Sequence, residues 1–242
     1  MRQMALHPGS AGPFVRDLQM ALNSRLNPSP NLMVNGIFDA ATGRAVRAFQ
    51  TAKWLQIDGI AGPATLDALY DTEQFAPILH NVAYISQPTP TTCWAAATAM
   101  IKHTTVGMIR MATPASMLTS NGSLINESEA GQRLTIHQSF ARLHGLRYYP
   151  PQSWSVQGLL NMIRQGPLML ELLWNARSFS AGTGSAGHYV VVIGARGSHA
   201  PDGSSTTLRI YNPDPAAIAM ESISYRSLLR NVPLGTFGIM TT

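Results

Sequence analysis

The chain has 242 residues, of which 45% are hydrophobic and 12% charged, with a mean hydropathy of +0.02. This composition excludes a disordered chain and leaves room for one large domain or two smaller ones. No segment approaches the roughly 18 apolar residues of a membrane-spanning helix, so we expect no membrane span. The net charge of +5 comes from scattered arginines, which argues against a nucleic-acid partner.

The N-terminal segment has no secretory signal pattern. Residues 1–30 contain no uninterrupted apolar run, because His7, Pro8, Arg16 and Asp17 interrupt every candidate. The single cysteine excludes an intramolecular disulfide and a multi-cysteine zinc site, which leaves packing or a reactive thiol as its role. Any export would therefore have to use a route without a signal peptide.

The N-terminal part contains an internal repeat, because residues 57–68 follow the pattern of residues 34–45. Each copy predicts a turn, at Asn35-Gly36 or Asp58-Gly59, followed by the start of a helix. Asp39 is the expected N-cap of one helix, and Pro63 the expected first residue of the other. Before the first copy, apolar residues at helical spacing predict a further helix. Three short helices are therefore expected to pack together.

The repeat and its flanking pattern resemble the peptidoglycan-binding type 1 domain over residues 7–70. The shared positions include Gly12, Gln19, Gln50 and the two Asn/Asp-Gly turns. The resemblance implies a three-helix module that brings an attached hydrolase to bacterial cell wall; a bundle that only packs against its neighbour is the alternative. We expect a domain over residues 1–72, a linker over 73–82 and a second domain over 83–242.

The only cysteine stands where a proline-rich loop passes into an alanine-rich helix. Thr91 or Thr92 is the expected cap of this helix. A thiol in the first helical turn faces unpaired amides and the positive end of the helix dipole, which predicts a lowered pKa and a nucleophilic Cys93. Gln87 lies six positions earlier, and its carboxamide and the Cys93 amide are expected to form an oxyanion hole.

Residues 187–194 form a β-branched run that predicts a buried strand beginning at His188. A loop over 196–205 and a second strand over 207–211 then return the chain, which would bring Asn212 beside His188. Helices are expected over 132–143 and 156–164, and an apolar strand over 168–174. The other histidines show no metal-ligand spacing, so we expect neither a metal nor another cofactor.

These motifs resemble the papain-like fold, with closest similarity to the bacterial C39-like and AvrRpt2-like cysteine peptidases. The resemblance implies an α+β fold in which a helical half carrying the nucleophile helix packs on an antiparallel sheet. It also implies that Cys93 is the nucleophile, His188 the proton carrier, Asn212 its orienting group and Gln87 an oxyanion donor. Asp214 is the alternative orienting group. We expect Trp94 and Trp174 to contact substrate.

A wall-binding module beside a cysteine hydrolase predicts cleavage of amide bonds in peptidoglycan. Without a signal peptide, we expect an antibacterial effector, made in the bacterial cytoplasm, exported by a contact-dependent route such as type VI secretion, and acting in the periplasm or wall of a target cell. Its expected partners are peptidoglycan, an immunity protein and a component of the secretion apparatus. A protease of proteins and a non-catalytic wall-binding protein are the alternatives.

Overall fold

The computed structural model describes residues 5–125, 132–173, 187–232 and 235–242. By their contacts these residues form two compact units. The first unit contains the chain up to Pro77, with Arg196–Leu208 and Ser222–Ser227. The second unit contains Ile78–Ala195, Arg209–Glu221 and the end of the chain from Leu228. Each unit is described by itself below.

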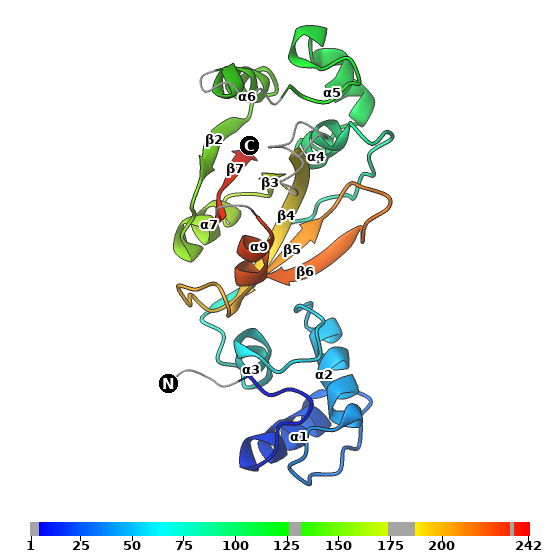
Figure 1. Ribbon diagram of the computed structural model, residues 1–242, viewed down its shortest axis with the longest axis vertical. Coiled ribbons are helices and arrows are strands. Elements are labelled where there is room, and N and C mark those ends of the chain that lie inside the picture. Colours follow the sequence, from blue (N-terminus) through cyan, green and yellow to red (C-terminus); the bar gives the residue numbers. More distant parts are fainter. Residues whose placement is uncertain (1–4, 126–131, 174–186, 233–234) are drawn as a thin grey trace. The chain divides into compact units, whose positions relative to one another are not determined.

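Three helices form the N-terminal module, by which we mean residues 5–72 of the first unit (Figure 1). They are α1 (Pro13–Arg25), α2 (Ala40–Ala52) and α3 (Pro63–Leu69). Asp39 caps α2, because its carboxylate accepts a hydrogen bond of 2.8 Å from the Thr42 amide, and Pro63 begins α3. Both predicted helix starts are therefore confirmed. The apolar faces meet in a core that includes Val15, Leu18, Leu22, Phe38, Val46, Phe49 and Leu69.

A buried glutamine holds each of the two repeated turns. Gln19 of α1 donates to the carbonyl oxygen of Ile37 (3.0 Å) and accepts from the Gly36 amide (3.0 Å). Gln50 of α2 makes the same pair of bonds with the second copy, namely to the Ile60 carbonyl oxygen (3.0 Å) and from the Gly59 amide (2.9 Å). Gly36 and Gly59 have φ angles of 77° and 75°. The repeat is therefore also a repeat of structure, with glycine at each left-handed position.

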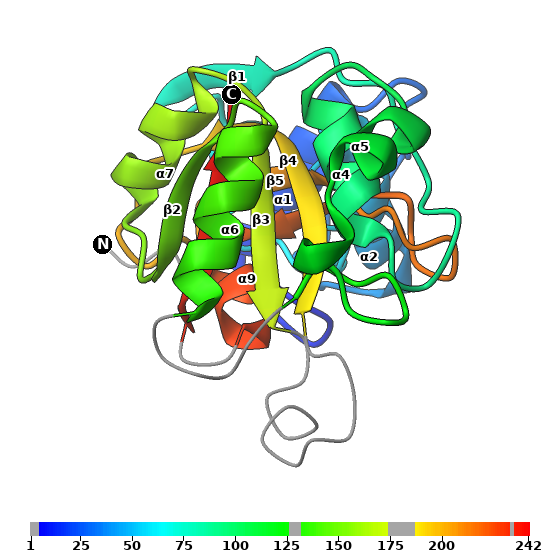
Figure 2. The same cartoon turned by 90° about the horizontal axis from the view of Figure 1, so that it is seen from above.

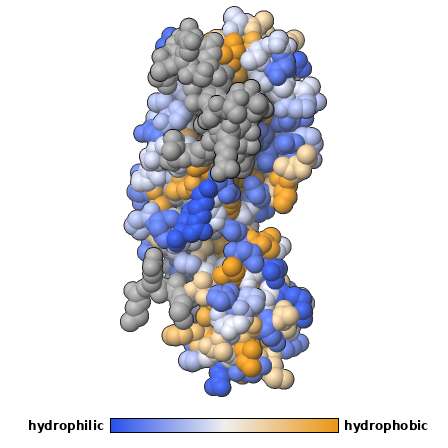
Figure 3. All heavy atoms as spheres, in the orientation of Figure 1, coloured by the Kyte–Doolittle hydropathy of each residue, from blue (hydrophilic) through white to orange (hydrophobic). Residues whose placement is uncertain are grey.

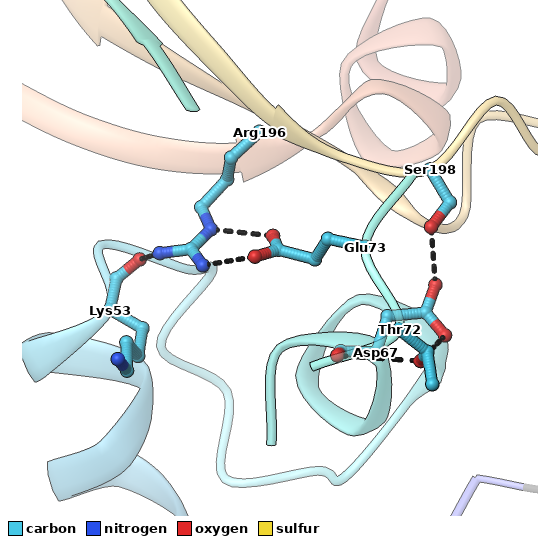
Figure 4. Close-up of polar contacts among 6 residues, drawn as sticks. All are labelled: Lys53, Asp67, Thr72, Glu73, Arg196 and Ser198. Carbon is cyan, nitrogen blue, oxygen red and sulfur yellow. Dashed lines mark hydrogen bonds and ion pairs between the residues drawn. The ribbon is translucent and has the colours of Figure 1, made fainter. Parts of the chain in front are cut away.

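The first unit also contains the turn after residue 195. There the Arg196 guanidinium donates two hydrogen bonds to the Glu73 carboxylate (2.7 and 2.5 Å) and one to the Lys53 carbonyl oxygen, as Figure 4 shows. Ser198 donates to Asp67 at 2.9 Å. The Arg196 side chain is 7% exposed, so this ion pair is shielded from water.

Residues 73–82, expected as a linker, contain a strand, β1 (Phe75–Leu79), that pairs with β4 (Gly187–Gly197). Backbone bonds continue at both ends of β1, from the Gln74 amide to Gly197 and from the His80 amide to Ile193. Pro77 is tolerated within β1 because this strand contributes a short sheet edge.

The main sheet has the strand order β2-β7-β3-β4-β5-β6. Its pairs β2–β7, β7–β3 and β3–β4 are antiparallel. The predicted α+β class is confirmed, and the expected helices and strands lie within a residue or two of their predicted bounds, except that β4 continues three residues past its expected end at 194. The strands are β2 (Arg147–Gln152), β3 (Leu168–Leu173), β5 (Thr206–Tyr211), β6 (Met220–Ser224) and β7 (Phe237–Thr241). The helices are α4 (Cys93–Ile101), α5 (Val106–Ala112), η1 (Ala115–Met117), α6 (Gln132–Leu143), α7 (Val156–Ile163) and α9 (Tyr225–Asn231).

Helices α4 and α6 lie over one face of the sheet in the second unit (Figure 2). The core beneath them joins Trp94 and Phe140 from the helices with Met169 and Val191 from β3 and β4. Every residue of α4 is buried, which explains why its sequence is almost entirely apolar. This packing holds the first residue of α4, Cys93, against the sheet.

Apolar residues on the visible surface form separate patches among hydrophilic ones (Figure 3). The most exposed large apolar side chains include Met33 and Phe14 in the first unit and Met111 and Ile218 in the second. Isolated exposed apolar residues are ordinary on folded proteins. Within the described ranges, no helix has the length and apolar character needed to cross a bilayer.

Candidate active site

Helix α4 begins at Cys93, as its sequence predicts, but without the predicted side-chain cap. Thr92 occupies the N-cap position, and its hydroxyl turns back to the Thr89 carbonyl oxygen at 3.0 Å. Thr91 donates instead to the carbonyl oxygen of Asn121 (2.8 Å). The prediction of a side-chain capping bond from Thr91 or Thr92 is therefore wrong. As a result, the backbone amides of Cys93 and Trp94 are left to interact with the Cys93 sulfur.

Burial and backbone hydrogen bonds shift the pKa of the Cys93 thiol in opposite directions. Burial raises the pKa of the Cys93 thiol, whereas the backbone amide of Tyr189 and the amides of Trp94 and Cys93 lower this pKa. Charge on Asp214 raises it further, and the net shift is upward. The prediction of a lowered pKa is wrong, because the residue is only 7% exposed and desolvation outweighs the helix amides. The resting group is a neutral thiol that needs a base.

His188 lies near the start of β4, and the backbone amide of the next residue, Tyr189, donates to the Cys93 sulfur, which brings the His188 backbone near the thiol. The His188 Nε2 atom is 2.7 Å from the Asn212 Oδ1 atom. The same Oδ1 atom accepts the Asp214 amide at 3.0 Å, which identifies it as an acceptor. Nε2 must therefore carry the proton in this bond. In the neutral ring, Nδ1 is then free of a proton and able to accept one.

Asn212 contacts His188 through this hydrogen bond. The Asp214 carboxylate accepts from the Ala216 amide at 2.9 Å and acts on the site through its charge. Burial lowers the pKa of His188 below its ordinary value of 6.5, while the Asn212 hydrogen bond and the Asp214 charge raise this pKa. The net lowering keeps the imidazole neutral near neutral pH.

Gln87 is tied to the same motif. Its backbone amide donates to the Pro213 carbonyl oxygen at 2.8 Å, and the Ser86 hydroxyl donates to that oxygen too. The Gln87 side chain is buried, with 6% exposure, and its Oε1 atom has no hydrogen-bond partner among the described residues. The loop before α4 and the Asn212-Pro213 segment are therefore joined directly.

The two tryptophans expected to contact substrate have different outcomes. Trp94 is 1% exposed, donates from Nε1 to the Gly122 carbonyl oxygen (3.0 Å) and packs edge-on against Phe140. It presents no surface to a substrate and belongs to the core, which corrects the expectation. Trp174 lies outside the described residues.

Sequence reasoning missed two features near Cys93. One is the Tyr189 backbone amide, which no side-chain motif reveals. The other is a buried polar group below Tyr189, formed by His137 and Glu171, with 1% and 4% exposure. A glutamate inside the apolar run 168–174 was the available signal, because carboxylates are rarely buried without a role or a partner. In the described part of the chain, no group of three or more His, Cys, Asp or Glu residues is arranged to hold a metal.

Residues 77–230 match the family model described as papain-like cysteine protease AvrRpt2. The chain belongs to this family. Its domain is accordingly a papain-like cysteine peptidase, a class of cysteine-dependent hydrolases. Residues 11–69 match a second model, a putative peptidoglycan binding domain. Both resemblances inferred from the sequence are confirmed.

Three individual proteins resemble parts of this chain. The zinc D-Ala-D-Ala carboxypeptidase of Streptomyces albus G is 41% identical over 68 residues, or 28% of this chain, and the match spans about a quarter (27%) of that enzyme. The SleB N-terminal domain is 30% identical with a TM-score of 0.27, covering 30% of this chain and 96% of that one. A double glycine motif protease from an AMS/PCAT transporter, solved with its leader peptide, is 16% identical with a TM-score of 0.38, covering 70% of this chain and 100% of that one.

Proposed function

We propose that the protein is a cysteine hydrolase that cleaves amide bonds of bacterial peptidoglycan, as an amidase or an endopeptidase. The observation that carries the proposal is the His188–Asn212 hydrogen bond, together with the Tyr189 amide bond to Cys93, in a chain with a putative peptidoglycan-binding domain. The first unit would concentrate the enzyme on the wall. The similarity of 68 residues of this chain to a D-Ala-D-Ala carboxypeptidase supports a wall substrate.

In the proposed mechanism, Nδ1 of His188 takes the thiol proton of Cys93 as the sulfur attacks the scissile carbonyl carbon. The tetrahedral oxyanion then collapses, and the leaving amine receives that proton from His188. Water, deprotonated by His188, hydrolyses the resulting thioester and restores the thiol. A neutral thiol beside a neutral imidazole suits this transfer, because the base is available at neutral pH.

Gln87 and the Cys93 amide are the proposed donors to the oxyanion. The Gln87 carboxamide is buried next to the nucleophile's loop, and one of its atoms has no partner among the described residues. Buried amides are normally satisfied, so such a group calls for an explanation. The atom without a partner is an acceptor, so a rotation that exchanges Oε1 and Nε2 would let Nε2 donate a hydrogen bond to the developing oxyanion.

The decisive experiment is digestion of purified peptidoglycan by the wild type and by Cys93→Ala, with products identified by mass. Glycan freed of intact stem peptides would indicate an amidase, and shortened stems or split cross-links an endopeptidase. A wild-type digest with the same products as the Cys93→Ala digest would sink the proposal.

A second candidate function is proteolysis of protein substrates, with the N-terminal module serving for delivery. The match of residues 77–230 to the AvrRpt2 protease family favours it. Unfolded casein separates the two candidates. Its degradation by the wild type, with peptidoglycan left intact, would favour protein substrates.

For the biological setting, we propose an antibacterial effector that is made in the bacterial cytoplasm, exported by a contact-dependent route and active in the wall of a target cell. Such a toxin needs an immunity partner in the producing cell. Periplasmic expression in a susceptible bacterium should stop growth, and Cys93→Ala should not. Normal growth with active protein in the periplasm would count against this setting.

A further inference from the structure

A buried polar cluster lies behind the candidate active site, formed by His137 of α6, Tyr148 of β2, Glu171 of β3 and Tyr189 of β4. The His137 Nε2 atom is 2.7 Å from the Tyr189 hydroxyl and 3.5 Å from Glu171 Oε1. The Tyr148 hydroxyl donates to the other Glu171 oxygen at 3.3 Å, and its ring stacks on His137. Four elements of the second unit therefore meet at one polar point inside the core.

The backbone leaves space for the Glu171 side chain. Glu171 pairs with Tyr189 across β3 and β4 and with Gly238 of β7 on its other side. A Cβ atom at Gly238 would lie 2.7 Å from Glu171 Oε2, closer than real Cβ atoms approach. Glycine at this position thus admits the carboxylate between the strands.

Burying such a cluster has an energetic cost. Removing a carboxylate from water costs several kcal/mol before its partners compensate, and apolar residues of similar volume often stabilise a fold better. His137 is 1% exposed and Glu171 4%. A stability role alone therefore explains the cluster poorly, and a positioning role explains it better.

Tyr189 connects this cluster to the nucleophile. Its hydroxyl contacts His137, its backbone amide donates to the Cys93 sulfur, and the residue directly before it is His188. Tyr189 thus contacts the cluster with its hydroxyl and Cys93 with its backbone amide. A shift of the Tyr189 ring would move both the donor to the sulfur and the backbone that carries the imidazole.

We propose that His137, Glu171 and Tyr189 are positioning residues that hold the Tyr189 amide against the Cys93 sulfur and so stabilise its thiolate. This inference rests on the proposed role of Cys93 as nucleophile. None of the three touches the substrate in this arrangement. They act through the amide, and their loss should change the reactivity of the thiol at a given pH.

Alkylation by iodoacetamide tests this directly, because Cys93 is the only cysteine and the reaction needs no substrate. Tyr189→Phe removes only the hydroxyl, and His137→Leu removes its partner. Each should slow alkylation at pH 7 about three- to tenfold, as loss of one hydrogen bond implies, and move the midpoint of the rate's pH profile upward. His137→Gln, which keeps a hydrogen-bonding group, should recover most of the rate.

Tyr225→Phe is the matched control, because Tyr225 is also buried, with 1% exposure against 6% for Tyr189, and lies in α9. It should leave the alkylation profile unchanged. If Tyr189→Phe fails to fold, Glu171→Gln, which keeps the shape and removes the charge, is measured in its place. Folded variants that keep the wild-type rate and midpoint would overturn the inference. Alkylation that is insensitive to His188→Ala would instead overturn the catalytic role on which the inference rests.

Discussion

Buried glutamines behave differently in the two units. Gln19 and Gln50, with 1% exposure each, bond to both flanks of a turn through both ends of the carboxamide. Gln87 in the second unit is nearly as buried, yet its Oε1 atom has no partner among the described residues. A satisfied buried amide stabilises a turn, whereas an unsatisfied one leaves bonding capacity for a ligand.

The same contrast extends to charged and titratable groups. In the first unit, the buried Arg196 is matched by both oxygens of Glu73 and by the Lys53 carbonyl oxygen. In the second, burial raises the pKa of Cys93 and lowers the pKa of His188, so both groups are held in their neutral forms. The Arg196 charge is thus paired within the first unit, whereas Cys93 and His188 are uncharged at rest.

Replacing the nucleophile should have the largest effect. Cys93→Ala is expected to reduce product formation by at least about 10⁴-fold, because no other group can form the covalent intermediate. Mass analysis of peptidoglycan digests measures it. Unfolding by denaturant should change little, since alanine fits the buried position. Substantial remaining turnover would rule out the thiol mechanism.

Exchanging glutamine for leucine should separate the two kinds of buried amide. Gln87→Leu is expected to lower turnover about 10²-fold, the usual loss for one oxyanion donor, with little change in the free energy of unfolding. Turnover and denaturant curves of the same preparation measure both quantities.

Gln50→Leu is the matched variant in the first unit. It removes the partners of the Gly59 amide and the Ile60 carbonyl oxygen, so the free energy of unfolding should fall by roughly 2–4 kcal/mol while the alkylation rate of Cys93 stays unchanged. A large stability loss in Gln87→Leu, or none in Gln50→Leu, would contradict the inference that Gln50 stabilises the fold and Gln87 serves the reaction.

The pH profile should report on His188. As the general base, His188 must be neutral, and its neutral fraction falls as the pH drops through its pKa. Because burial lowers that pKa, the acidic limb of kcat/KM should lie below 6.5. Asn212→Ala removes a bond that raises the pKa, so the limb should move to still lower pH, with turnover reduced about tenfold or more.

Steady-state rates across the acidic range measure this shift. Asp214→Asn serves as a comparison, since it removes a charge that also raises the pKa of His188 but leaves the His188–Asn212 hydrogen bond in place. An acidic limb in Asn212→Ala at higher pH than in the wild type would contradict the assignment.

The smallest expected effect concerns the cap of α2. Hydrogen bonds from Thr42 lower the pKa of Asp39 below its ordinary value of 3.8 in the folded protein. Its contribution to stability is therefore present above that value and is lost as the pH falls through the folded pKa. Asp39→Asn keeps a capping oxygen but does not titrate.

The difference in unfolding free energy between the wild type and Asp39→Asn should therefore shrink on acidification. Denaturant curves at neutral pH and below 3.8 measure it. A difference that grows toward acid pH would show that another group dominates the pH dependence of the unfolding free energy.

Local patterns were sufficient for much of the fold. The Asn35-Gly36 and Asp58-Gly59 turns, the Asp39 cap and the Pro63 helix start depend on backbone conformations that neighbouring residues dictate. The start of α4 and the strand after Gly187 follow from composition and proline placement in the same way. Family resemblance added the expected site, and the structure brings His188 and Asn212 into contact.

The sequence by itself determined these elements and the identity of the chemical groups. Tertiary structure alone decided how those groups behave. Burial reversed the expected shift of the Cys93 pKa and turned Trp94 into a core residue, while the Thr92 hydroxyl bonded backward rather than to the helix. The His188–Asn212 contact and the cluster beneath Tyr189 depend on contacts between distant segments. Desolvation and long-range pairing arise only when the chain is packed, so no local pattern encodes them.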